Sequence, residues 1–103
     1  MKQYSKLVRD LIPEIIQNSG KECKTRILTD AEYKEKLAQK LCEEANEFLE
    51  SKDKEELADV LEVFLSLLEA YDFTIEEVDA IREVKAAKRG GFSKRIELLE
   101  VSD

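Results

Sequence analysis

The stretch from Leu57 to Leu68 constrains the fold most, because it is apolar around most of the circumference of a helix. Its apolar side chains are those of Leu57, Val60, Leu61, Val63, Phe64, Leu65, Leu67 and Leu68. A helix of this kind needs more than one packing partner. A chain of 103 residues covers such a helix poorly by itself. We therefore expect a helical bundle in which copies of the chain pair their central helices, as a homodimer or a higher oligomer.

Composition supports an all-α fold in one domain over residues 1–103. The chain is 43% hydrophobic and 40% charged, with three glycines and one proline, which is typical of a soluble, helix-rich protein. Capping signals predict about four helices. Their expected starts are Asp10, Asp30, Asp53 with Glu56, and Thr74 with Glu77. Their expected ends are Ser19-Gly20, Ser51, Tyr71 and Arg89-Gly90.

Two short segments outside these helices alternate apolar and polar side chains. They are residues 24–28 and residues 95–101. Alternation of this kind is typical of a strand with one buried face. We expect the two segments to pair as a small two-stranded ribbon.

Charge is distributed unevenly along the chain. The net charge of −7 argues against a nucleic-acid polymer as the partner, because such binding needs a broad basic surface. Residues 43–62 contain nine acidic residues and two lysines, whereas residues 82–95 contain six basic residues and one glutamate. The first segment is suited to cations and the second to anions. No apolar run approaches a membrane span and residues 1–10 contain no apolar signal core, so a cytoplasmic location is expected.

The chain contains no histidine, which excludes the usual imidazole bases, nucleophile pairs and metal ligands. The two cysteines carry no pattern that assigns them chemistry. Any catalysis must therefore depend on carboxylates, amines, guanidiniums, hydroxyls or a bound metal.

Two acidic pairs at helical spacing provide such carboxylates. Glu44 lies on or beside the apolar stripe of the second predicted helix, and Glu47 follows one turn later. Glu56 and Asp59 repeat this spacing at the start of the third. A short link makes the two helices antiparallel neighbours, which brings all four carboxylates to a similar height. Because all the candidate ligand atoms are oxygens, they favour Mg²⁺ or Mn²⁺. Such an ion would offset the repulsion between the four carboxylates. The alternative is that the two pairs are ordinary solvated surface residues.

The same residues carry a resemblance. The stretches "KLVRDLIPEII", "KLCEEANEFLE", "EELADVLEVF" and "REVKAAKRGGF" resemble MazG-like, all-α nucleoside triphosphate pyrophosphohydrolases, in the branch labelled phosphoribosyl-ATP pyrophosphohydrolase-like. The resemblance implies that Glu44, Glu47, Glu56 and Asp59 are the metal ligands and the catalytic carboxylates, with Glu43 in support. The spacing between Glu47 and Glu56 is shorter than in many MazG domains.

The implied reaction is hydrolysis of a nucleoside triphosphate between its α and β phosphates, which gives the monophosphate and pyrophosphate. There are two hypotheses for the substrate. One is a noncanonical nucleotide that the enzyme removes in a housekeeping role, and the other is phosphoribosyl-ATP of histidine biosynthesis. Lys85, Lys88 and Arg89 are expected to bind the phosphates, and Lys6 and Arg9 to line the pocket. The alternative for Lys85, Lys88 and Arg89 is an ordinary place at a helix C-terminus, which basic residues favour. The alternative for Lys6 and Arg9 is a capping or pairing role. A non-enzymatic helical module that serves oligomerisation or regulation is the alternative from another class.

Overall fold

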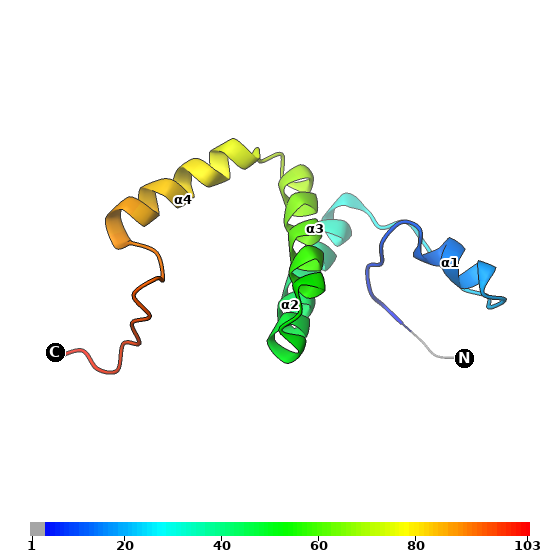
Figure 1. The fold of residues 1–103 in the computed structure, drawn as a ribbon. Helices are drawn as coiled ribbons and strands as arrows, with labels where there is room; N and C mark the ends of the chain where they lie inside the picture. The colour runs from blue at the N-terminus through cyan, green and yellow to red at the C-terminus, as the bar shows by residue number, and fades with distance from the viewer. Residues whose placement is uncertain (1–3) are drawn as a thin grey trace. The chain divides into compact units, whose positions relative to one another are not determined.

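The computed structural model describes residues 4–103, and this part of the chain contains four helices and no strand. The helices are α1 (Ile12–Asn18), α2 (Asp30–Ser51), α3 (Lys54–Ala70) and α4 (Ile75–Arg89), labelled in Figure 1. The predicted all-α class is therefore confirmed. None of the described helices combines the length and the apolar character that a membrane crossing requires. The chain divides into two compact units, one that extends to Asp72 and one that runs from Phe73 to Asp103.

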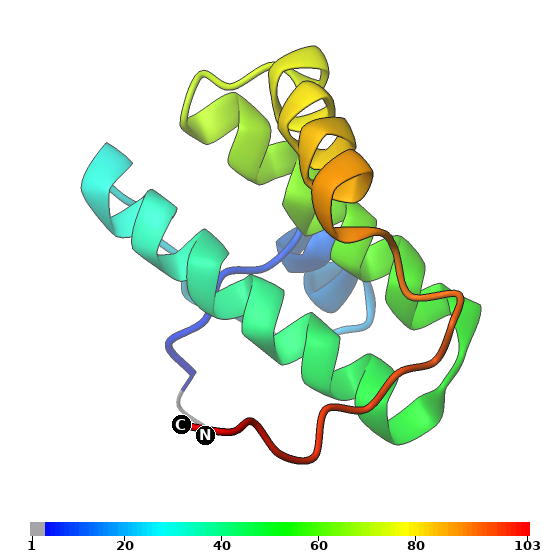
Figure 2. The same cartoon turned by 90° about the vertical axis from the view of Figure 1, so that its left-hand side faces the viewer.

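The first unit is built on α2 and α3, which lie side by side as an antiparallel hairpin (Figure 2). Its buried apolar side chains are Leu37 of α2 and Val63 and Leu68 of α3. Leu37 is only 3% exposed, so the apolar stripe expected on α2 does face the core. Burial of such side chains supplies most of the driving force for pairing the two helices.

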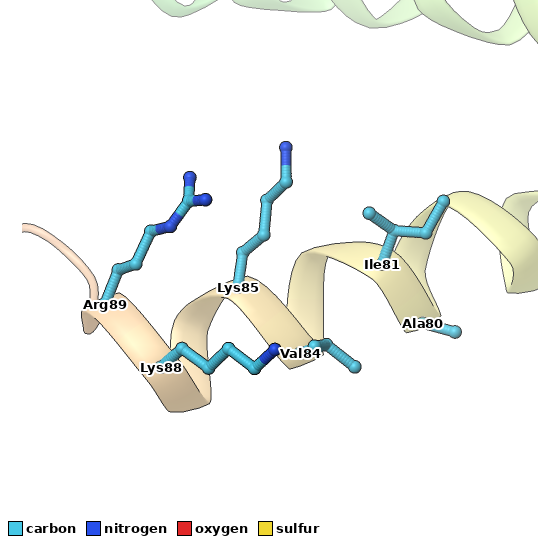
Figure 3. Close-up of a pocket in the computed structure, with 6 residues that line it drawn as sticks. All are labelled: Ala80, Ile81, Val84, Lys85, Lys88 and Arg89. Atoms are coloured by element: carbon cyan, nitrogen blue, oxygen red, sulfur yellow. The ribbon is translucent and has the colours of Figure 1, made fainter.

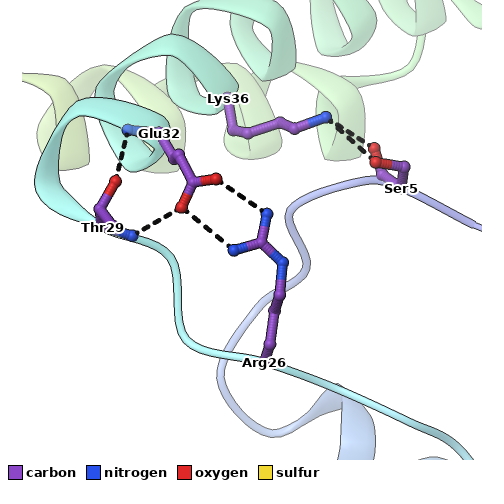
Figure 4. Close-up of polar contacts among 5 residues, drawn as sticks. All are labelled: Ser5, Arg26, Thr29, Glu32 and Lys36. Atoms are coloured by element: carbon purple, nitrogen blue, oxygen red, sulfur yellow. Dashed lines mark hydrogen bonds and ion pairs between the residues drawn. The ribbon is translucent and has the colours of Figure 1, made fainter.

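The start of α2 is fixed by a capping box in which Thr29, and not the predicted Asp30, is the N-cap. The Thr29 hydroxyl accepts a hydrogen bond from the backbone N–H of Glu32 at 3.2 Å, and the Glu32 carboxylate accepts one from the Thr29 N–H at 3.0 Å (Figure 4). Arg26 donates two further hydrogen bonds to this carboxylate, at 3.1 and 3.0 Å. These contacts lower the pKa of Glu32 to about 2, chiefly through Arg26 and then through the Thr29 backbone.

The turn between α2 and α3 is tight. Lys52 closes α2 in the left-handed region, with φ 60°, and donates its backbone N–H to the Phe48 carbonyl. Asp53 is the N-cap position of α3 but makes no side-chain hydrogen bond there. The predicted Asp53–Glu56 capping box is therefore wrong, and the Glu56 side chain lies instead among the carboxylates described below.

Helix α1 is short and begins after Leu11, without a side-chain cap, so the predicted Asp10 cap is also wrong. Pro13 occupies the first turn, where its missing N–H costs no intrahelical hydrogen bond. The segment before α1 is joined to α2 by Lys36, whose Nζ donates to the Ser5 carbonyl at 2.9 Å (Figure 4).

The second unit contains α4 and the C-terminal tail. The predicted capping box is confirmed, because the Thr74 hydroxyl accepts from the Glu77 N–H at 3.1 Å and the Glu77 carboxylate accepts from the Thr74 N–H at 3.1 Å. Gly90 follows the helix with φ 78° and donates its N–H to the Ala86 carbonyl. Only glycine takes this backbone conformation without steric cost, which explains the stop.

The predicted ribbon is wrong, since neither residues 24–28 nor residues 95–101 form a strand. Arg95 has a left-handed φ of 57°, and its N–H is bonded to the Phe92 carbonyl in a local turn. Alternation indicates a strand only where a partner strand satisfies the backbone N–H and C=O groups. The two segments belong to different units of the chain, and each follows an irregular path.

Candidate metal centre

Three carboxylates from the α2–α3 hairpin form the candidate site. Glu44 of α2 meets Glu56 and Asp59 of α3, and one carboxylate oxygen from each lies within 4.8 Å of the other two. All three residues are half-buried. We call these three residues the carboxylate trio. The tight turn places the end of α2 beside the start of α3, which is why residues of the two helices meet at the same height.

Only 13% of the Glu44 side chain is accessible to solvent. A carboxylate with so little access to solvent needs a nearby positive charge, because burial disfavours its charged form. Lys40 supplies it from one turn earlier on α2, with its Nζ 3.4 Å from a Glu44 oxygen and 3.4 Å from a Glu43 oxygen. The Lys40 ammonium group thus offsets negative charge at the Glu44 end of the trio.

Asp59 is compensated from a remote part of the chain. Arg9 precedes α1, and its Nη2 donates to the Asp59 Oδ1 at 2.7 Å. Its Nη1 lies 3.8 Å from an oxygen of Glu62, one turn further along α3. The guanidinium therefore lies against two carboxylates of α3, one of which belongs to the trio.

Glu56 has no cation of its own among the ion pairs of the described residues. Its pKa is raised above the ordinary glutamate value, first by desolvation and then by the negative charges of Asp59, Glu47, Glu44 and Asp53. The proton is held more tightly because the ionised form would add to an already negative surrounding. Glu56 is thus desolvated and also repelled by its acidic neighbours.

Glu47, the fourth carboxylate expected from the sequence, is exposed and does not belong to the trio. It is close enough to contribute to the raised pKa of Glu56. Glu43 is also exposed, and it pairs with Lys40. The structure therefore groups three of the four predicted ligands and places the other near their edge.

The basic residues expected to bind the substrate lie in three different settings. Lys6 stands over the ring of Tyr4, 5.8 Å from its centre, whereas Arg9 is part of the trio's surroundings. Lys85, Lys88 and Arg89 belong to the second unit, where they line a shallow hollow along α4. The other lining residues are Ala80, Ile81 and Val84. Figure 3 shows Lys85 and Arg89 extending to the same side of the helix, as their spacing of four residues requires.

The chemistry of the trio fits a hard divalent cation. Its donors are carboxylate oxygens alone, and three acidic groups near one point repel each other until a cation neutralises them. Mg²⁺ is commonly held by one or two carboxylates, and its remaining positions are left to water and substrate phosphates. Glu44, Glu56 and Asp59 are the residues that would hold such an ion.

Sequence reasoning missed Lys40 and gave Arg9 a different role. The signal for Lys40 was local, since it precedes Glu43 by three residues and Glu44 by four on one helix face. The Arg9–Asp59 pair joins positions 50 residues apart and has no local signal.

Comparisons with protein-family models, curated proteins and solved structures give no match to this chain.

Proposed function

We propose that this chain is a Mg²⁺-dependent, MazG-like nucleoside triphosphate pyrophosphohydrolase, with Mn²⁺ as an alternative ion. The observation that carries the proposal is the carboxylate trio, in which oxygens of Glu44, Glu56 and Asp59 approach within 4.8 Å of one another. The sequence resemblance supplies the reaction class, and the trio supports it because phosphoryl transfer depends on charge neutralisation more than on covalent chemistry.

A divalent cation bound by the trio would neutralise phosphate charge and make a bound water more acidic. The chain's own residues provide the rest of the chemistry. Glu44, Glu56 and Asp59 would hold that ion, and a carboxylate beside it would orient or deprotonate the attacking water. Glu44 and Asp59 fix the position of the site on two packed helices.

Lys85, Lys88 and Arg89 are proposed to bind the triphosphate. They lie in the last turns of α4, and Lys85 and Arg89 share one side of it (Figure 3). A guanidinium forms two parallel hydrogen bonds with a phosphate, and lysine adds a point charge. The Gly90-Gly91 pair that follows gives the chain freedom to adjust around the phosphates.

For the substrate we favour a noncanonical nucleoside triphosphate in a housekeeping reaction, with phosphoribosyl-ATP as the second candidate. A panel of triphosphates incubated with Mg²⁺ and assayed for pyrophosphate and nucleoside monophosphate separates the two. Glu44→Gln and Asp59→Asn should abolish pyrophosphate release and leave the helical circular dichroism unchanged. Glu55→Gln, at an exposed neighbour outside the trio, should keep pyrophosphate release. Mg²⁺-independent release, or full activity of either trio variant, would reject the proposed reaction.

Assembly into a homodimer or higher oligomer is part of the proposal. Leu57, Leu61 and Leu65 lie four residues apart on one face of α3 and are 50%, 55% and 46% exposed. About half of each of these side chains is therefore accessible to solvent. A second copy would bury it by pairing α3 with α3. Light scattering at micromolar concentration should give at least twice the chain mass, and Leu61→Glu should give the monomer mass.

The same apolar row favours the non-enzymatic alternative, a helical module that binds a partner or a second copy. The two functions differ in their dependence on the trio. If Leu61→Glu disrupts assembly and no triphosphate releases pyrophosphate with Mg²⁺ or Mn²⁺, the module is the better description. If pyrophosphate release depends on Glu44 and Asp59, the protein is an enzyme whatever its assembly.

A further inference from the structure

Arg9 brings a cation of the chain itself to the carboxylate trio. Its Nη2 is 2.7 Å from Asp59 Oδ1, a contact between segments 50 residues apart. The guanidinium is 55% exposed and the Asp59 side chain 39% exposed, so the pair is open to water. Exposed ion pairs are weak and exchange readily, because water and salt compensate each partner when they separate.

Glu62 offers Arg9 a second position. It follows Asp59 by one helical turn, and its carboxylate is already 3.8 Å from Arg9 Nη1. The guanidinium therefore lies within reach of both carboxylates. Lys36 keeps the N-terminal segment near α2 through the Ser5 carbonyl, at 2.9 Å, so Arg9 remains close after it leaves Asp59.

We propose that Arg9 competes with the divalent cation for Asp59: it occupies Asp59 in the cation-free protein and moves to Glu62 when the cation binds. The inference rests on the proposed metal site and adds a residue that sets the affinity of that site. Asp59 cannot give the same oxygen fully to a guanidinium and to a metal ion, and two positive charges side by side repel each other. Arg9 therefore weakens cation binding while protecting the trio from unbalanced charge.

Calorimetric titration with Mn²⁺, without nucleotide and at fixed ionic strength, tests this competition. Arg9→Gln should bind Mn²⁺ roughly two- to fivefold more tightly than the wild type, the range that corresponds to an exposed ion pair. Arg26→Gln is the matched control, since it removes the same charge from a guanidinium that pairs with Glu32 and not with the trio. Its Mn²⁺ affinity should equal that of the wild type.

A double-mutant cycle tests the second position. Glu62→Gln should weaken Mn²⁺ binding in the wild-type background, because Arg9 then has no alternative to Asp59. The same change should have a smaller effect when Arg9→Gln is already present. Both changes are at exposed side chains, and circular dichroism checks that each variant keeps its helices.

The outcomes separate this inference from the metal site itself. If the wild type does not bind Mn²⁺, the metal site and the competition both fail. If the wild type binds but Arg9→Gln binds with equal or lower affinity, only the competition fails. Equal effects of Glu62→Gln in both backgrounds would overturn the transfer to Glu62.

Discussion

Replacing Glu56 by glutamine tests the charge balance of the trio in the absence of any substrate. Glutamine keeps the shape of the side chain but removes the charge that Asp59, Glu47, Glu44 and Asp53 oppose. Without a divalent cation, Glu56→Gln should therefore raise the melting temperature at pH 7. The direction of this effect follows from the raised pKa of Glu56, which means that its ionised form disfavours the folded state. Below the ordinary pKa of 4.5 the Glu56 carboxyl is protonated and costs the fold nothing. As pH rises through the folded-state pKa, the carboxyl ionises and the folded state loses stability. Near pH 3.5 the variant and the wild type should melt together.

A saturating cation should reverse the order. At a concentration of 100 times the dissociation constant, a ligand that binds only the folded state adds about 2.7 kcal/mol. For a domain of this size each kcal/mol shifts the melting temperature by about 4–8 °C, so the wild type should gain about 10–20 °C. Glu56→Gln has lost one of three ligands and should gain much less.

The assay is thermal melting by circular dichroism with EDTA and with Mg²⁺ or Mn²⁺, at constant ionic strength. Glu55→Gln is the control, because Glu55 shares the first turn of α3 but lies outside the trio. It should follow the wild type in both conditions. An equal cation-induced shift in the wild type and Glu56→Gln would refute the metal-ligand role, and a lower melting temperature of Glu56→Gln in EDTA would refute the repulsion.

Three further predictions concern the core, the phosphate site and acid stability. Leu37→Ala, at the most buried side chain, should lower the free energy of unfolding by roughly 2–5 kcal/mol in urea titrations; a loss under 1 kcal/mol would mean that this core is not intact in solution. Arg89→Ala should lower kcat/KM roughly 10- to 100-fold with Mn²⁺ affinity unchanged, whereas a helix-end role alone predicts unchanged kcat/KM. Glu32, with its pKa near 2, should stabilise the fold above pH 4.5 and lose this effect as pH falls toward 2, so the urea midpoint of Glu32→Gln should change less with acid than that of the wild type.

Helix positions followed from the sequence where a local rule decides them. The Thr74–Glu77 box and the Gly90 stop were both predicted, because each depends only on neighbours in the chain. Thr29 was missed in favour of Asp30, since both residue types cap helices well; Glu32, three residues after Thr29, decides for Thr29 through the reciprocal bond. The two ribbon segments failed because a strand depends on its partner and not on its own alternation.

The candidate site divides in the same way. Helical spacing and a short turn are local, so the approach of Glu44, Glu56 and Asp59 could be predicted. Glu47 lies on the adjacent strip of α2 and stays exposed, a difference that depends on the rotation of α2 against α3. The pairing of Arg9 with Asp59 depends on the path of the N-terminal segment, which no periodicity in the sequence encodes.

The sequence separation of the Arg9–Asp59 pair also bears on the order of events in folding. Helices α2 and α3 meet across a two-residue link, so their hairpin closes quickly and at small entropic cost. The Arg9–Asp59 contact closes a loop of about 50 residues. A single exposed ion pair stabilises the fold too little to offset the entropy of closing this loop early in folding. A newly made chain therefore passes through a stage in which the three carboxylates are assembled and no guanidinium lies on them. During that stage the proposed metal ion would bind the trio without competition from Arg9.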